Sequence, residues 1–157
     1  MNYVGLKPTN VESVVDDLNT LLSNYHIYYQ NLRNYHWNVT GPNFFDLHEK
    51  FEELYNEAKI SIDEIAERIL TLRESPTSTL AEYLEMASIK EKSTRDPHKM
   101  VEFVLEDHKM LINNMRSVIE NASKASDEGT IDLIAGFLST IEKKSWMLDA
   151  WHTRVYA

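Results

Sequence analysis

The chain has 157 residues, of which 43% are apolar, contains no cysteine and carries a net charge of −9. This length suits one domain with a substantial core, so a single domain spanning residues 1–157 is expected. Lack of cysteine excludes disulfides, thiolate catalysis and cysteine-based zinc or iron–sulfur sites. The acidic net charge disfavours binding to nucleic-acid phosphates and favours binding of cations or basic partners.

The first half of the chain predicts two long helices. Apolar residues recur every three or four positions over residues 10–37, which is the pattern of an amphipathic helix. Thr9 and Glu12 form a capping-box signature at its start. The stretch NVTGP ends this helix because its glycine and proline both disfavour helical backbone. A second helix is expected over about residues 43–72.

The second half predicts one short helix and two long ones. Thr79 with Glu82 forms another capping box, which opens a short helix ending at about Ala87. A third long helix begins at Pro97, with the preceding aspartate as its N-cap. The fourth spans about residues 130–153.

Together these elements predict an all-α four-helix bundle with a short extra helix in the connection between the second and third long helices. The small, polar residues 121–128 are expected to join the last two helices. The connection over residues 73–95 is long enough to cross the length of the bundle, so the topology need not be simple up-and-down.

The same sequence predicts a cytoplasmic location without a membrane partner. No apolar run approaches the ~20 residues that a membrane span requires. The segment MNYVGLKPTN also lacks the charged start and apolar stretch of a secretory signal.

Two histidines and three carboxylates form the most informative constellation, and they cannot all meet within one chain. Glu52 lies four residues after His48, and Glu67 four after Asp63, so each pair shares a helix face. His48 and Asp63 are 15 positions apart, which on a straight helix is ~22 Å. Bonds from metals to nitrogen or carboxylate donors are only ~2.0–2.2 Å long. If these residues, with His36, form one metal site, a second chain must complete it.

The numbering indicates how a second chain could do so. Positions 48 and 67, and likewise 52 and 63, lie symmetrically about a point between residues 57 and 58. An antiparallel pairing of this helix with its own copy would place His48 opposite Glu67 and Glu52 opposite Asp63, as in a two-fold interface. The nitrogen and oxygen donors suit iron, manganese or zinc, and the donor types alone do not indicate which of these metals binds.

Plainer interpretations of the same residues remain open. His36 continues an apolar stripe and could be an ordinary buried histidine, and Asp63 and Glu67 could pair with Lys59 or Arg68 in a solvated network. An intrachain di-iron site of the Glu-x-x-His type is not encoded, because no glutamate lies three residues before any of the six histidines.

Residues 34–69, NYHWNVTGPNFFDLHEKFEELYNEAKISIDEIAERI, closely resemble the Dps family of dodecameric mini-ferritins. The family pattern is a histidine before tryptophan, a second histidine twelve residues on, an acid four residues later, and then Asp-x-x-x-Glu. This chain supplies His36, His48, Glu52, Asp63 and Glu67 in that order and spacing. The resemblance extends over essentially the whole chain and includes WMLDAW near its end.

The resemblance implies a ferritin-like fold and a hollow shell of twelve subunits that oxidises Fe(II), preferably with hydrogen peroxide, and stores a ferric mineral. It implies an iron site with His36 and His48 from one subunit and Asp63 and Glu67 from its partner, where zinc or manganese could substitute for iron. Glu52 falls where the family often has aspartate, which leaves open whether it binds the metal directly or through water.

Two further assignments rest on the resemblance. Trp37 is similar to the family tryptophan that quenches stray oxidising equivalents beside the iron, although packing at the interface is an alternative role. Asp127, Glu128 and Asp132 match the position of an acidic three-fold pore that admits Fe(II). Acidic residues in a first helical turn are also favourable with the helix dipole alone.

Direct DNA binding is expected to be weak or absent. Family members that bind DNA commonly do so through basic tails, whereas the two ends of this chain offer only Lys7 and Arg154. A ferroxidase that stores iron is therefore the leading hypothesis. A nucleoid-associated DNA-compacting protein with secondary iron chemistry and a purely structural helical oligomer are the alternatives.

Overall fold

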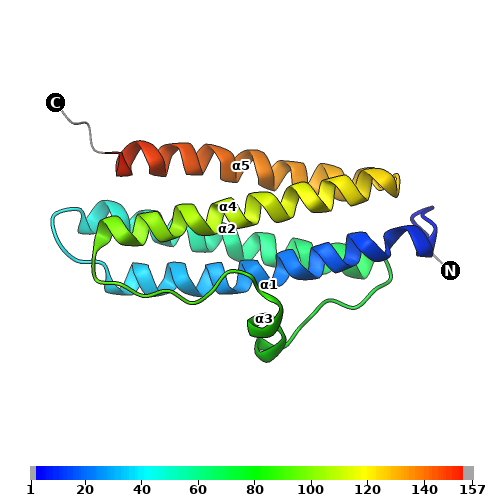
Figure 1. Ribbon diagram of the computed structural model, residues 1–157, viewed down its shortest axis with the longest axis horizontal. Helices are drawn as coiled ribbons and strands as arrows, with labels where there is room; N and C mark the ends of the chain where they lie inside the picture. The colour runs from blue at the N-terminus through cyan, green and yellow to red at the C-terminus, as the bar shows by residue number, and fades with distance from the viewer. Residues whose placement is uncertain (1–2, 154–157) are drawn as a thin grey trace.

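The computed structural model describes residues 3–153 and contains four long helices and one short helix (Figure 1). Their bounds are α1 Pro8–Asn38, α2 Phe44–Thr71, α3 Leu80–Met86, α4 Pro97–Lys124 and α5 Glu128–His152. No strand occurs among these residues. The predicted all-α bundle with an extra short helix between its second and third long helices is therefore confirmed.

The four long helices run side by side, and α3 packs outside α1 (Figure 1). Helices α2 and α4 run in the same direction, because the connection between them returns along the length of the bundle (Figure 1). Helix α1 packs on both α2 and α4, and α4 packs on α5. The core between them consists of fully buried apolar side chains, among them Leu18, Leu21, Leu32, Phe51, Ile65, Ile69, Met100 and Leu111. No described helix is long and apolar enough to cross a membrane.

Of the two capping boxes predicted from the sequence, the structure contains one. Thr79 and Glu82 form the predicted capping box, with the Thr79 hydroxyl accepting from the Glu82 N–H. The capping box predicted at Thr9 is wrong, because α1 already begins at Pro8 and no side chain caps it. Proline suits the first helical position because its φ is preset and its missing N–H would have no partner there.

The predicted connection over residues 121–128 is also too long. Helix α4 continues through Lys124 and α5 begins at Glu128. Ala122 is fully buried, so core packing keeps these small residues helical despite their weak signal. The chain reverses at Ser126, whose φ of 56° lies in the left-handed region.

Two buried asparagines of α1 hold the long connection in place. The Asn24 side-chain carbonyl accepts a 2.9 Å hydrogen bond from the Ile89 N–H. The Asn31 amide donates to the Lys90 carbonyl at 3.0 Å, and its oxygen accepts from the Lys92 N–H. Because buried backbone groups need partners, these bonds fix a segment that has no helical hydrogen bonds of its own.

His108 is a core histidine, as its place on the apolar stripe of α4 suggests. It is fully buried, its Nε2 lies 2.8 Å from the Tyr28 hydroxyl, and its Nδ1 lies 2.8 Å from the Ser145 hydroxyl. Removal from water lowers the pKa of this imidazole from 6.5 to about 3.

Folding stability should therefore fall as the pH drops from 6.5 towards 3, because the unfolded chain binds a proton at His108 and the folded chain does not. The expected slope from this residue is about 1.4 kcal/mol per pH unit. Urea unfolding at several pH values and fixed protein concentration measures it. His108→Gln should flatten that slope, whereas an unchanged slope would contradict the assignment.

Candidate metal centre

The two predicted histidine ligands lie face to face at one end of the bundle. His36 is in the last turn of α1 and His48 in the second turn of α2. The tight connection between the helices uses Gly41, whose φ of 101° is accessible to few other residues. The two rings stack with centroids 3.8 Å apart and planes 18° from parallel. Two histidines that are twelve positions apart in the sequence thus form a compact pair of imidazoles.

A reciprocal pair of hydrogen bonds orients both rings. The Nδ1–H of His36 donates to the His48 carbonyl at 2.7 Å, and the Nδ1–H of His48 donates to the His36 carbonyl at 2.8 Å. A carbonyl oxygen can only accept, so each Nδ1 must carry the proton. In the neutral rings this leaves both Nε2 lone pairs available to a metal ion, and metal-binding histidines are commonly held in this way.

The carboxylates occupy two separate regions of α2. Glu52 is exposed one helical turn after His48, while Asp63 and Glu67 are exposed near the far end of the helix. On α2, His48 and Asp63 are ~22 Å apart along the axis. Within residues 3–153, no three or more His, Cys, Asp or Glu side chains are grouped closely enough to hold a metal ion. The helical distance means that a site using both regions requires two chains.

The surface of α2 beside Asp63 and Glu67 combines polar and charged side chains with two isoleucines. Asp63 and Glu67 line an open groove together with Ile60 and Ile62. Ile60 is 61% exposed and lies close to positions 57 and 58, through which the predicted two-fold axis would pass. An exposed isoleucine beside acidic ligands fits a surface that a second copy covers.

Aromatic side chains surround the histidine pair. Phe44 stacks on His48 with centroids 4.9 Å apart, and Tyr55 meets the His36 ring edge-on at 5.3 Å. Trp37 remains 58% exposed, with the Arg33 guanidinium 4.8 Å from its ring centre. Phe44 and Tyr55 were not predicted to lie beside these histidines, because aromatic residues at helical spacing are equally typical of a core.

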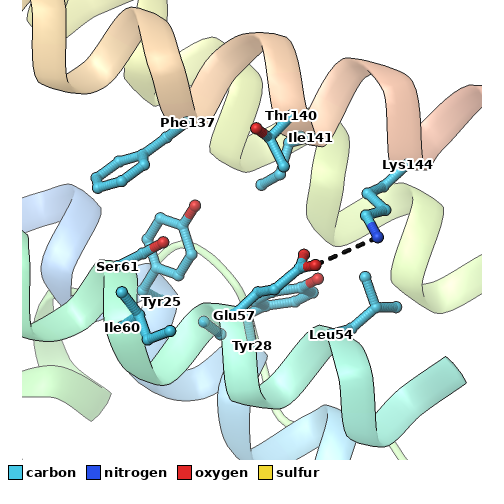
Figure 2. Close-up of a pocket in the computed structure, with 11 residues that line it drawn as sticks. Tyr25, Tyr28, Leu54, Glu57, Ile60, Ser61, Phe137, Thr140, Ile141 and Lys144 are labelled. Atoms are coloured by element: carbon cyan, nitrogen blue, oxygen red, sulfur yellow. Dashed lines mark ion pairs between the residues drawn. The ribbon is translucent and has the colours of Figure 1, made fainter. Parts of the chain in front are cut away.

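In the middle of the bundle, aromatic, polar and charged side chains of three helices line a common space (Figure 2). A cavity of about 270 Å³ lies between α1, α2 and α5 and is lined by Tyr25, Tyr28, Glu57, Ser61 and Lys144, among others. The Lys144 ammonium pairs with Glu57 at 3.2 Å and also with Glu53. Its hydrogen bond to Glu53 holds the pKa of that carboxyl below its usual value. Lys144 of α5 thus pairs with two carboxylates of α2 in the middle of the bundle.

The three predicted pore acids differ in their surroundings. Asp127 is buried, caps α5 by accepting from the Thr130 N–H at 3.0 Å, and pairs with Arg68 at 2.6 Å. Its carboxylate is therefore engaged within the subunit. Glu128 and Asp132 are exposed in the first turns of α5, and their pore role stays a prediction.

The fold is that of a ferritin-like protein, and residues 15–155 match the family model described as "Ferritin-like domain". "DNA protection during starvation protein 2" of Bacillus anthracis is 42% identical over 141 residues, covering 89% of this chain and 97% of the relative. "DNA protection during starvation protein" of Brevibacillus brevis is 45% identical, covering 85% and 91%.

Solved structures agree with these relatives. The Vibrio cholerae O1 DPS protein, described as "a member of a broad superfamily of ferritin-like diiron-carboxylate proteins", is 40% identical with a TM-score of 0.94, covering 98% of this chain and 97% of that one. A Dps protein from Bacillus brevis is 42% identical with a TM-score of 0.90, covering 94% and 100%. The chain belongs to the Dps family.

Proposed function

We propose that this protein is a ferroxidase and iron-storage protein of the cytoplasm. In this proposal it oxidises Fe(II), preferably with hydrogen peroxide, at sites shared between two subunits and stores ferric mineral inside a hollow dodecamer. The observation that carries the proposal is the reciprocal hydrogen bonding of His36 and His48, because it leaves two Nε2 lone pairs free for a metal ion at one end of the bundle. Soluble iron and peroxide would both be removed, which protects the cell from oxidative damage.

Each group in the proposed site has a defined role. His36 and His48 bind Fe(II) as neutral ligands, while Asp63 and Glu67 of the partner subunit supply negative oxygen donors, which stabilise Fe(III) over Fe(II). Two Fe(II) ions each give one electron to one peroxide, which takes up two protons and leaves as two waters. Because both electrons are available together, no hydroxyl radical needs to be released.

Two residues would support this chemistry. Glu52, one turn after His48, contributes a carboxylate either directly or through water. Trp37, next to His36 in the chain, takes up stray oxidising equivalents. Zinc or manganese could compete for the same donors, and a Dps from Listeria innocua, 34% identical to this chain, has been soaked with 10 mM zinc.

The direct test mixes purified protein with Fe(II) and peroxide and follows the ferric absorbance. We expect a rapid phase that is faster with peroxide than with dioxygen. His36→Ala/Asp63→Ala should lose this phase while still assembling, as judged by light scattering. Equal rates in the variant and the wild type would instead favour a structural oligomer without iron chemistry.

Physical DNA compaction is the second candidate, favoured by the relatives named for DNA protection. Against it, each subunit carries a net charge of −9, and Lys7 is the basic residue of the first ten positions. Arg154, the basic residue of the other end, lies outside the described residues. Protection through removal of iron and peroxide requires no contact with DNA.

A gel shift should therefore show no tight complex with duplex DNA at physiological salt without divalent metal, because an acidic shell repels phosphates. Tight complexes under these conditions would contradict the prediction. A variant with four lysines inserted after Met1 is the matched control, and it should gain salt-sensitive binding.

A further inference from the structure

A second pair of histidines lies where α4 begins and α5 ends, at the same end of the bundle (Figure 1). The ring centroids of His98 and His152 are 6.0 Å apart, with the planes inclined by 51°. The Trp151 ring stacks on His98, with centroids 4.9 Å apart, and supports one side of the pair. The proposed iron chemistry uses neither histidine.

The Nδ1 atoms of His98 and His152 are both buried, and neither has a hydrogen-bond partner among the described residues. Buried polar atoms nearly always have a partner, so two such atoms on adjacent rings need an explanation. The capping carboxylate of Asp96 accepts a hydrogen bond from the backbone N–H of His98, so this bond does not involve the His98 ring.

The spacing of the rings suits one shared metal ion. A metal bonded to one nitrogen of each ring at ~2.1 Å stands ~3.2 Å from each ring centre, so the centres lie ~5.2 Å apart at a tetrahedral angle and ~6.4 Å apart when collinear. The observed 6.0 Å falls within this interval. Neutral imidazole nitrogens are good ligands for zinc, copper and nickel.

We propose that His98 and His152 form a second binding site, for a divalent transition-metal ion of the zinc class. The site is separate from the pair His36 and His48. One site built from both pairs would group four histidines, and no group of three or more potential ligands occurs within residues 3–153. The two imidazoles supply two nitrogen donors, which hold the ion at this end of the bundle. Such a site retains metal ions without oxidising them.

Zinc titration of the assembled full-length protein tests the proposal. Zinc also suits the proposed iron site, so the titration uses a His36→Gln/His48→Gln background, in which that site is disabled. Adding His98→Gln to this background should lower the zinc bound by one ion per chain. Adding His152→Gln instead should cause the same loss. His26→Gln is the matched control, because His26 is half-buried and stacked on Tyr83, and it should lose nothing.

Crystals of the background soaked in zinc should show an anomalous peak between His98 and His152 that disappears in His98→Gln. Equal zinc binding with and without His98→Gln, or crystals without the peak, would overturn the proposal. The outcome does not depend on the iron site. If that site is wrongly assigned, the background and the wild type bind equal amounts of zinc, and the loss caused by His98→Gln is still measured.

Discussion

Asp63→Asn should slow iron oxidation as severely as His48→Gln, by at least ~100-fold for each, although the two residues lie ~22 Å apart on one helix. Both are expected to contribute to the same site, one from each subunit, so loss of either removes a metal ligand. Stopped-flow measurement of ferric absorbance after mixing with Fe(II) and peroxide gives the rates.

Glu64→Gln is the matched control for Asp63→Asn. Glu64 is the next residue on α2, is also exposed, and loses the same unit of charge in the substitution. It should change the rate less than twofold. Equal slowing by both substitutions would mean that general acidity, and not ligation, attracts the iron.

Arg68→Ala should destabilise the protein by about 3–5 kcal/mol, because it leaves a buried carboxylate without its cationic partner. Arg68 contacts Asp127 at 2.6 Å and donates from Nε to the Thr130 hydroxyl at 2.9 Å, which fastens α2 to the start of α5. Asp127 is only 1% exposed. Urea unfolding at fixed protein concentration measures the change.

Arg116→Ala provides the comparison for a solvent-exposed pair. Arg116 contacts Glu142 at the same 2.6 Å, but the side chains are 60% and 46% exposed. Its removal should cost at most about 1 kcal/mol. Similar losses for the two arginines would show that burial of Asp127 does not govern the strength of the contact with Arg68.

The sequence was sufficient for the elements whose signals are periodic. The apolar repeats located all four long helices, and Thr79 with Glu82 located the start of the short one. Two predictions from local signals failed, the first because of a competing local preference of proline and the second because of tertiary packing. Thr9 resembles a cap, but Pro8 is already helical, and residues 121–124 look like a loop, but burial of Ala122 keeps them in α4.

The site could be predicted only in part, for a similar reason. Spacing along a helix is fixed by geometry, so the separation of His48 from Asp63 followed from the sequence alone. The stacking of His36 on His48 and their exchanged Nδ1 hydrogen bonds depend on how the connection between α1 and α2 folds. The burial of Asp127 against Arg68 likewise needs the packing of two distant helices.

In the proposed assembly, each iron site draws its histidines from one subunit and its carboxylates from another. Co-expression of two inactive variants, His36→Gln/His48→Gln and Asp63→Asn/Glu67→Gln, tests it most directly. A mixed two-fold pair combines intact histidines with intact carboxylates at one of its two sites, so random pairing should restore roughly one quarter of the wild-type rate. If the co-assembled protein stays as inactive as each variant alone, the shared site is contradicted.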